Sequence, residues 1–275
     1  MIPESERPAS SPFDLPALDA VLRGTIFAGR LHFSAVTDST NTDALAAARS
    51  GAPHGSVFFA DEQLAGRGRG DHAWESQAGQ GLYVSVLLRP AFPAVRLALL
   101  PLAAGLAAAH AVHECTGLDV DIRWPNDLLI GDCKTGGILV EAKTESNSVA
   151  YAVVGIGINV HQRSFAANLA TPATSLDLAA GRANSRQSLL VALLRALERE
   201  VLQLHGPDAA QALPRRVQQA SSWVHGRSVH VHGPQACSGM TAGLDENGFL
   251  RVRTAEGVVT VQTGGLRAAK SDGEL

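Results

Sequence analysis

The chain has 275 residues, of which 45% are apolar and 18% charged, and its formal net charge is −3 at pH 7. This composition is typical of a globular protein that buries a sizeable core, and the charge disfavours a basic nucleic-acid-binding protein. The three cysteines, Cys115, Cys133 and Cys237, are odd in number and widely spaced. They therefore predict neither a disulfide framework nor a zinc site.

The N-terminal region carries no basic segment followed by an apolar run, so no export signal is predicted. The longest apolar stretch, residues 97–112, contains Pro101 and His110 and is too short for a membrane span. Residues 1–28 are interpreted as a largely disordered tail, because residues 1–12 are rich in Pro and Ser. A cytoplasmic location is expected from the cysteine usage.

After this tail, segments with helical and strand patterns follow each other without strict alternation. Helices are predicted over 41–50, 97–116, 189–204 and 209–220, and strands over 55–62, 82–88, 128–130, 136–142 and 149–160. The strands at 128–130 and 136–142 form a hairpin by their spacing. The fold class predicted for residues 29–222 is therefore α+β with a mixed sheet.

The sequence pattern changes after Trp223. Short alternating segments follow, separated by turn residues such as Asn247-Gly248, and they cover 229–232, 238–244, 249–253 and 258–262. Several short strands at this spacing predict a small barrel. A domain boundary is accordingly placed near residue 223, with a second domain over residues 223–275.

The most informative segment is Gly66-Arg67-Gly68-Arg69-Gly70, which follows a predicted strand and precedes Trp74. Alternating glycines let the backbone approach a ligand closely, and two guanidinium groups are suited to phosphate or carboxylate. Trp74 can stack over a flat ligand or fill an apolar slot. A solvated basic loop with Trp74 in the core explains the same residues, whereas the spacing excludes a P-loop.

Two turns and one strand add further polar groups beside glycine. Asn126 and Asp127 lie in a turn, where such side chains also commonly bond the local backbone. Lys134 precedes Gly136-Gly137 at the entrance to a buried strand, where it is either solvated or placed to reach an anion. In Gly155-Ile156-Gly157-Ile158-Asn159, the glycines indicate close approach by a ligand or a neighbouring helix, and Asn159 offers a donor and an acceptor.

Together these segments resemble the biotin protein ligases. The matching motifs, in chain order, are Asp38-Ser39-Thr40-Asn41, Gln63-Leu64-Ala65-Gly66-Arg67-Gly68-Arg69 with Trp74, Arg123-Trp124-Pro125-Asn126-Asp127, Lys134-x-x-Gly137-Ile138-Leu139-x-Glu141, and Gly155-x-Gly157-Ile158-Asn159. They agree with the family in order and spacing over roughly residues 30–270. The resemblance implies a catalytic domain of the class II synthetase-like type, followed by an SH3-like barrel.

The activity implied by the resemblance is the conversion of biotin and ATP with Mg²⁺ into biotinyl-5′-AMP. The biotin then passes to a lysine on the biotin carboxyl carrier domain of a carboxylase. The implied catalytic residues are Lys134, Arg67 and Arg69. The implied biotin-binding residues are Ser39, Thr40, Asn41, Gln63, Gly66, Arg67, Trp74, Lys134, Gly137 and Leu139, and those for ATP are Arg67, Arg69, Trp74, Asn126 and Asn159. No protein ligand for a metal is implied.

The chain departs from the family pattern at two places. Gly70-Asp71-His72-Ala73 stands where many members carry a further Gly-Arg, and Arg123 stands where lysine is more usual. The short segment before the first strand leaves no room for a DNA-binding module, so a monofunctional ligase without nucleic-acid or membrane binding is expected. The sequence leaves open whether the chain forms a homodimer through an edge strand around residues 134–160. The alternatives are a lipoate- or octanoate-type protein ligase and a non-catalytic biotin-responsive regulator.

Overall fold

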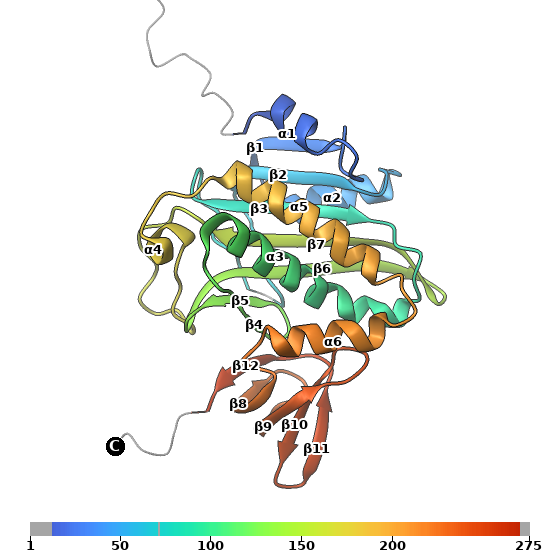
Figure 1. The fold of residues 1–275 in the computed structure, drawn as a ribbon, viewed down its shortest axis with the longest axis vertical. Coiled ribbons are helices and arrows are strands. Elements are labelled where there is room, and N and C mark those ends of the chain that lie inside the picture. Colours follow the sequence, from blue (N-terminus) through green and yellow to red (C-terminus); the bar gives the residue numbers. More distant parts are fainter. Residues whose placement is uncertain (1–12, 71, 270–275) are drawn as a thin grey trace, which may run out of the picture.

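The computed structural model describes residues 13–70 and 72–269, and its larger part is built on a seven-stranded sheet (Figure 1). The strand order is β1-β2-β3-β7-β6-β5-β4, and β1 pairs with β2 in parallel while the other neighbours are antiparallel. The strands are β1 (Leu31–Thr37), β2 (Ser56–Gln63), β3 (Gly81–Leu88), β4 (Asp121–Arg123), β5 (Asp127–Ile130), β6 (Cys133–Glu145) and β7 (Ser148–Asn159). The predicted α+β class with a mixed sheet is confirmed.

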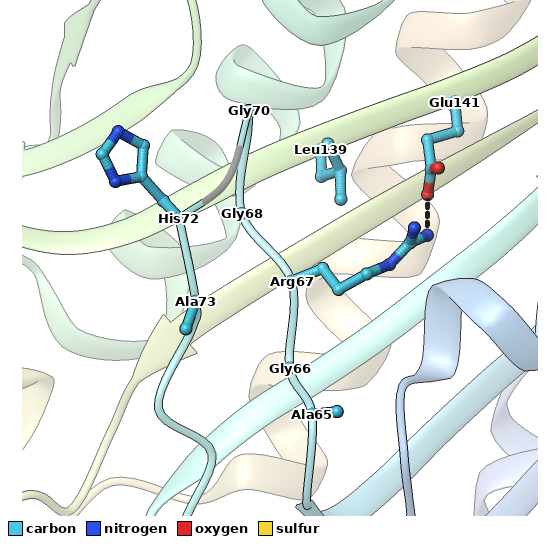
Figure 2. Close-up of a pocket in the computed structure, with 9 residues that line it drawn as sticks. All are labelled: Ala65, Gly66, Arg67, Gly68, Gly70, His72, Ala73, Leu139 and Glu141. Carbon is cyan, nitrogen blue, oxygen red and sulfur yellow. Dashed lines mark hydrogen bonds and ion pairs between the residues drawn. The ribbon is translucent and has the colours of Figure 1, made fainter.

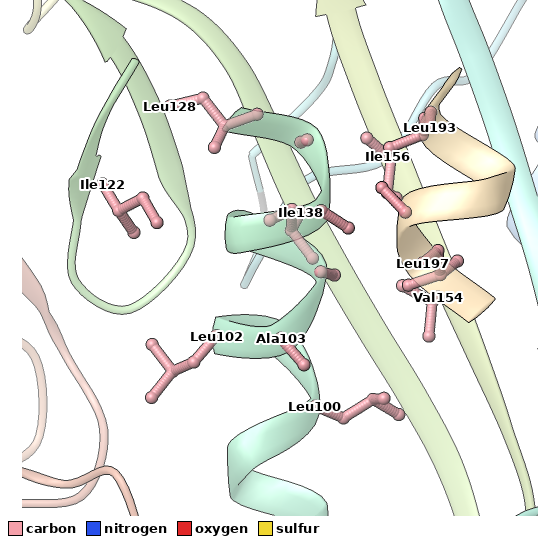
Figure 3. Close-up of a cluster of buried hydrophobic side chains, with 14 of the residues drawn as sticks. Leu100, Leu102, Ala103, Ile122, Leu128, Ile138, Val154, Ile156, Leu193 and Leu197 are labelled. Atoms are coloured by element: carbon pink, nitrogen blue, oxygen red, sulfur yellow. The ribbon is translucent and has the colours of Figure 1, made fainter. Parts of the chain in front are cut away.

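Helices cover both faces of this sheet. On one face lie α3 (Leu100–Thr116) and α5 (Arg186–Gln203), whose leucines and alanines pack together and against Ile138 and Ile156 (Figure 3). On the other face α2 (Thr40–Arg49) packs on Leu87 and Val153 through its alanines. This division follows from the alternation of side chains along a strand. The short helices are η2 (Ala94–Leu99), α4 (Leu176–Ala180) and α6 (Ala209–Gln219).

The apolar stretch 97–112 was expected to be too short for a membrane span, but the helical segment Ala94–Thr116 that contains it is long and apolar enough to cross a membrane by length and composition alone. Its alanine and leucine side chains are buried between the sheet and α5, so membership of the core accounts for its apolar character. Gly117 ends this helix in the left-handed conformation, with φ 78°, as glycine does most readily. The predicted helix and its end at Gly117 are therefore confirmed.

The predicted disordered tail is wrong for residues 13–28, which are ordered. They contain α1 (Leu15–Val21), begun by Asp14, whose Oδ1 accepts a hydrogen bond from the Ala17 amide at 3.0 Å. Phe13, Leu18, Leu22 and Phe27 are at most 2% exposed, and the Phe13 ring meets Phe59 of β2 edge-on at 5.1 Å. These apolar residues indicated an ordered segment, but the prediction was based on the composition of the first twelve residues. Residues 1–12 themselves lie outside the described range.

The second sheet is formed by β8 (His225–His232), β9 (Cys237–Leu244), β10 (Leu250–Thr254), β11 (Gly257–Val261) and β12 (Gly265–Ala268). Its order is β11-β10-β9-β8-β12, and all neighbours are antiparallel. The sequence predicted four of these strands but missed β12, which is short, follows Gly264 and begins with Gly265. The predicted all-β character of this part is confirmed.

Polar and aromatic contacts join the second sheet to the first. Trp124 Nε1 donates to the Gly248 carbonyl at 3.0 Å, which ties the β4–β5 turn to the β9–β10 connection. The Trp223 ring lies between two guanidinium groups, with Arg227 Cζ 3.7 Å and Arg123 Cζ 5.2 Å from its centroid. The second sheet is thus attached beside the strands that carry the candidate site.

Candidate active site

A pocket of about 450 Å³ lies between the Gly-Arg loop and β6 (Figure 2). Its lining residues are Ala65, Gly66, Arg67, Gly68, Gly70, His72, Ala73, Leu139 and Glu141. The loop and the Lys134–Glu141 motif were separate features of the sequence, and the fold places them on opposite walls of one pocket. In Figure 2 the Arg67 side chain reaches across to Glu141, with which it forms an ion pair.

The loop itself is a narrow hairpin. The Gly68 amide donates to the His72 carbonyl at 2.7 Å, and the Trp74 amide donates to the Gly66 carbonyl at 2.8 Å. A side chain at Gly66 would bring its Cβ to 2.3 Å from the Trp74 carbonyl oxygen, so the close return of the chain requires glycine there. His72 lines the pocket, whereas Asp71, the other departure in this loop, lies outside the described residues.

A row of hydrogen-bonded polar side chains connects α2 to β2, β3 and β6. Gln63 Oε1 accepts from the Thr40 amide at 2.9 Å and from Thr40 Oγ1 at 3.1 Å. Thr40 Oγ1 lies 2.8 Å from Ser85 Oγ, which donates to Asn41 Oδ1 at 2.5 Å. Asn41 Nδ2 donates to Glu141 Oε2 at 2.9 Å. The structure thus brings Thr40, Asn41 and Gln63 together, as the family resemblance implied.

Ser85 belongs to this row and was missed by the sequence analysis. It lies within the apolar strand segment Leu82–Leu88 and is fully buried. A buried hydroxyl in a central strand needs a partner, and a lone serine in an otherwise apolar strand was the available signal. Ser39, which was predicted, is 3% exposed, and its hydroxyl makes no capping bond to α2.

The glycines of β6 and β7 make room for two side chains. At Gly155 a Cβ would lie 2.1 Å from Asn41 Oδ1, and at Gly157 it would lie 2.6 Å from Trp74 Nε1. Gly137 pairs with Gly157 across the strands, and its Cβ would lie 3.3 Å from the same indole. The expected close approach at these glycines is confirmed. The approaching groups are Asn41 of α2 and Trp74 of the loop.

The indole of Trp74 therefore packs against two glycines, Gly137 and Gly157. Its Nε1 is buried and has no hydrogen-bond partner among the residues that the structure describes. A buried indole donor without a partner is uncommon in a folded protein. Lys134 Nζ lies 5.4 Å from the centroid of the same ring, which places the indole beside the predicted catalytic lysine.

Lys134 forms an ion pair with Asp127, with Nζ 2.6 Å from Oδ1. The other carboxylate oxygen, Oδ2, accepts from Arg123 Nε at 3.1 Å and from Nη2 at 2.6 Å. Burial alone would raise the pKa of Asp127, but the neighbouring Lys134 and Arg123 outweigh it and hold this pKa below its usual value. Arg123 donates to Asp127 Oδ2 through two nitrogen atoms of one guanidinium group. The single ammonium group of lysine, which is more usual at this position in the family, does not offer this geometry.

Arg69 is directed away from the pocket. Its Nη1 donates to the Gly264 carbonyl and its Nη2 to Thr263 Oγ1, each at 2.8 Å. Both acceptors lie in the turn between β11 and β12 of the second sheet. The two loop arginines thus have different partners, a carboxylate for Arg67 and neutral oxygen atoms for Arg69. The sequence analysis grouped them on one ligand and did not predict this separation.

The amide side chains of Asn126 and Asn159 are bonded within the protein. Asn126 Nδ2 donates to the Ile138 carbonyl at 2.9 Å, which ties the β4–β5 turn to β6. Asn159 Nδ2 donates to the Thr174 carbonyl at 3.1 Å, and its Oδ1 accepts from Gln162 at 3.2 Å. The amide keeps a second hydrogen on Nδ2 and a second lone pair on Oδ1 beyond these two bonds.

Within residues 13–70 and 72–269, no group of three or more His, Cys, Asp or Glu side chains could hold a metal ion. Arg67 of the loop and Lys134 of β6 each form an ion pair, with Glu141 and Asp127, whereas Arg69 is bonded to neutral oxygens outside the pocket. The cations of Arg67 and Lys134 are of the kind that suits an anionic ligand.

Comparisons with known proteins agree with the motifs. The model of the Biotin/lipoate A/B protein ligase family matches residues 33–159. The bifunctional ligase/repressor BirA of Bacillus subtilis is 34% identical over 244 residues, which are 86% of this chain and 73% of that protein. The biotin–[acetyl-CoA-carboxylase] ligase of Mycobacterium tuberculosis is 33% identical over 242 residues, which are 86% of this chain and 87% of that protein.

Among solved structures, the biotin protein ligase of Aquifex aeolicus in complex with biotin and ATP is 28% identical, with a TM-score of 0.73. The match covers 88% of this chain and 100% of that chain. The agreement in sequence and fold over 86–88% of the chain, together with the matching motifs around one pocket, shows that the chain belongs to the biotin protein ligase family.

Proposed function

We propose that the protein activates biotin with ATP to biotinyl-5′-AMP and transfers the biotin to a lysine of a biotin carboxyl carrier domain. The observation that carries this proposal is the pocket in which the Gly-Arg hairpin faces β6. Lys134 lies beside its tryptophan, and the Thr40–Gln63 polar row lies at the adjoining ends of α2 and β2. This arrangement offers a cationic region and a neutral polar region in one site.

In the first step, a carboxylate oxygen of biotin attacks the α-phosphorus of ATP, and the bond to the bridging oxygen of the β-phosphate breaks. Pyrophosphate leaves, and a mixed anhydride forms. Lys134 and Arg67 would donate hydrogen bonds to the oxygens on which negative charge is concentrated, and preorganised donors of this kind lower phosphoryl-transfer barriers. Mg²⁺ would enter with ATP and be held chiefly by its phosphates, as is usual for this ion.

In the second step, the amine of the carrier lysine attacks the carbonyl carbon of the anhydride. The bond to the phosphate oxygen breaks, AMP leaves, and the attacking nitrogen loses a proton as the amide forms. No enzyme nucleophile is required, so none of the three cysteines has a part in the mechanism. The carboxylate of Asp127, which is held ionised by Lys134 and Arg123, fixes the lysine at the site.

The neutral end of the site fits the ureido group of biotin, which has one carbonyl acceptor and two N–H donors. The buried Ser39 hydroxyl is not bonded to α2, and it lies next in sequence to Thr40, which is bonded to Gln63. These hydroxyl and amide groups can both donate and accept. Trp74 and Leu139 supply apolar surface for the ring and chain.

The finer fold assignments are also proposals. The five antiparallel strands β8–β12 support an SH3-like module, and the mixed sheet with α2 and α3 supports the class II synthetase-like type. A cytoplasmic enzyme whose partner is the carrier domain of a carboxylase is consistent with these assignments.

The decisive experiment is biotin-dependent exchange of pyrophosphate into ATP, with lipoate and octanoate as alternative substrates. We expect exchange with biotin alone and transfer to a biotin carboxyl carrier protein. Lys134→Ala should reduce exchange by about 10²–10³, since losing a charged donor to the reacting group costs roughly 2.7–4 kcal/mol. Lys143→Ala is the matched control, because Lys143 lies further along β6 with a side chain that is 57% exposed.

Two results would contradict the proposal. Exchange supported by lipoate or octanoate rather than biotin would identify the alternative ligase, and absence of exchange with biotin bound would favour a regulator. If Lys134→Ala retains exchange within about threefold of the wild-type rate, the role assigned to Lys134 is excluded.

A further inference from the structure

The Gly-Arg hairpin makes a side-chain link to the second sheet through Arg69. The two acceptors, Thr263 Oγ1 and the Gly264 carbonyl, follow Arg69 by 194 and 195 positions in the chain. They lie in the turn between β11 and β12. One guanidinium group therefore connects the loop at the pocket with the domain that the sequence analysis treated as a separate barrel.

The turn that accepts these bonds is itself fixed. Gln235 Oε1 accepts from the Gln262 amide at 2.8 Å and from the Thr263 amide at 3.3 Å. Gly264 has φ +151°, and a Cβ at this position would lie 2.8 Å from the His232 carbonyl oxygen. The turn is thus packed tightly against β8, and its acceptors have a defined position to which a side chain can be anchored.

The loop that is anchored is rich in glycine. Gly66, Gly68 and Gly70 alternate with the arginines, and ordering the backbone costs about 1–2 kcal/mol for each residue. Gly70 has φ +62° and no neighbouring atom within 4 Å of a Cβ placed on it. A bond from the adjacent Arg69 to the β11–β12 turn therefore restricts the hairpin next to Gly70.

The anchor leaves the charge of Arg69 uncompensated by a direct ion pair. Its acceptors are neutral, and a guanidinium has five N–H donors, of which the two bonds use two. Burial lowers the pKa of the Arg69 guanidinium, and attraction to the carboxylate of Asp127 opposes this effect. The anchored group thus lies within the electrostatic influence of the Asp127–Lys134 pair, with donors to spare for an anion.

We propose that Thr263 is a positioning residue for the adenylate-forming site. This inference rests on the proposed function. Its hydroxyl, together with the Gly264 carbonyl, holds Arg69 and thereby keeps the hairpin tip over the pocket. The retained intermediate is a mixed anhydride, which water can hydrolyse once it escapes. Holding the loop in place keeps biotinyl-5′-AMP bound until the carrier lysine attacks it.

The test is Thr263→Val, which removes the acceptor while preserving the size and β-branching of the side chain. Thr260→Val is the matched control, because Thr260 lies in the adjacent strand β11, is exposed, and has a hydroxyl that makes no hydrogen bond with the residues that the structure describes. Thr263→Ser retains the hydroxyl and should behave as wild type. Two quantities are measured, the rate of tryptic cleavage after Arg69 and the fraction of biotinyl-5′-AMP released in a single turnover.

We expect Thr263→Val to raise both quantities by about threefold or more, as loss of a hydrogen bond to a charged group predicts, and Thr260→Val to change neither. In an Arg69→Ala background, Thr263→Val should release no further intermediate, because Thr263 acts through Arg69. Wild-type values for Thr263→Val, or an effect that adds to that of Arg69→Ala, would overturn the proposal.

The cleavage measurement needs no catalysis and separates this proposal from the proposed function. If the wild-type protein forms no biotinyl-5′-AMP, the proposed ligase activity fails. Faster cleavage after Arg69 in Thr263→Val would then still establish the anchor, whereas unchanged cleavage would overturn the anchor whatever the activity. An unfolded Thr263→Val variant would be replaced by Thr263→Ala, judged by the same two outcomes.

Discussion

Replacement of Asp127 by asparagine tests how the charged part of the site is held together. The carboxylate binds Lys134 through one oxygen, at 2.6 Å, and Arg123 through the other, at 3.1 and 2.6 Å. The side chains of Arg123 and Asp127 are 9% and 18% exposed. Asparagine keeps the shape but leaves two largely enclosed cations without a counter-charge, so we expect a loss of about 2–4 kcal/mol in the free energy of unfolding.

The measurement is urea unfolding near neutral pH, with Asp132→Asn as control. Asp132 lies in the same hairpin, its side chain is 90% exposed, and it lies 3.7 Å from Arg227. Surface pairs of this kind contribute about 0–1 kcal/mol, so the control should lose little. If Asp127→Asn costs less than about 0.5 kcal/mol, the three-residue ion-pair cluster does not stabilise the fold and the reasoning is wrong.

The pH dependence supplies a second check on Asp127. Burial by itself would raise the pKa of this carboxyl, yet Lys134 and Arg123 lower it below the usual 3.8. A group with a lowered folded-state pKa stabilises the protein above its unfolded pKa, and this contribution is lost as the pH falls through the folded value. The stability difference between wild type and Asp127→Asn should hold down to about pH 5 and shrink only below about pH 4. Its loss already near about pH 6 would contradict the assigned ionisation.

Two further substitutions test the glycine platform and the N-terminal segment. Gly157→Ala would place a methyl group 2.6 Å from Trp74 Nε1. Because this displaces the indole, we expect the affinity for biotin, measured by calorimetry, to fall about tenfold. An unchanged affinity would exclude contact between Trp74 and biotin. Leu18→Ala truncates a side chain that is 1% exposed. We expect the free energy of unfolding, measured in urea, to fall by about 2–4 kcal/mol. A fall of less than about 0.5 kcal/mol would show that residues 13–28 contribute little to the core.

Much of the fold could be predicted because its determinants are local. Gly117 ends the central helix, and Asn247-Gly248 lies in the connection between β9 and β10, as turn residues do. The errors have physical causes as well. The composition of residues 1–12 was extended to residue 28, although Phe13 and Phe27 carried the opposite signal. Strand β12 is only four residues long and is held by pairing with β8, which no local pattern reveals.

The site could be predicted in part, because each motif is a short stretch of sequence with its own signal. The pairing of side chains between motifs could not be predicted. Asn41 and Glu141 are 100 residues apart, and Arg69 and Thr263 are 194 apart. No local pattern in a single sequence shows which carboxylate or hydroxyl will lie opposite a given arginine, because these residues are brought together only by the fold. For the same reason Ser85, an isolated serine in an apolar strand, was not recognised.

The charge distribution at the site explains how a protein with a net charge of −3 can bind an anionic intermediate. Arg67 is balanced by Glu141, while the single carboxylate of Asp127 faces both Lys134 and Arg123. Arg69 is bonded to neutral oxygens, so its charge is not cancelled by a direct partner. The ion pairs fix the geometry, and the Lys134–Asp127–Arg123 cluster has one positive charge in excess, which would attract a phosphate under the proposed function. Because Arg69 is held by the second sheet, the electrostatics of the catalytic pocket depend on both domains.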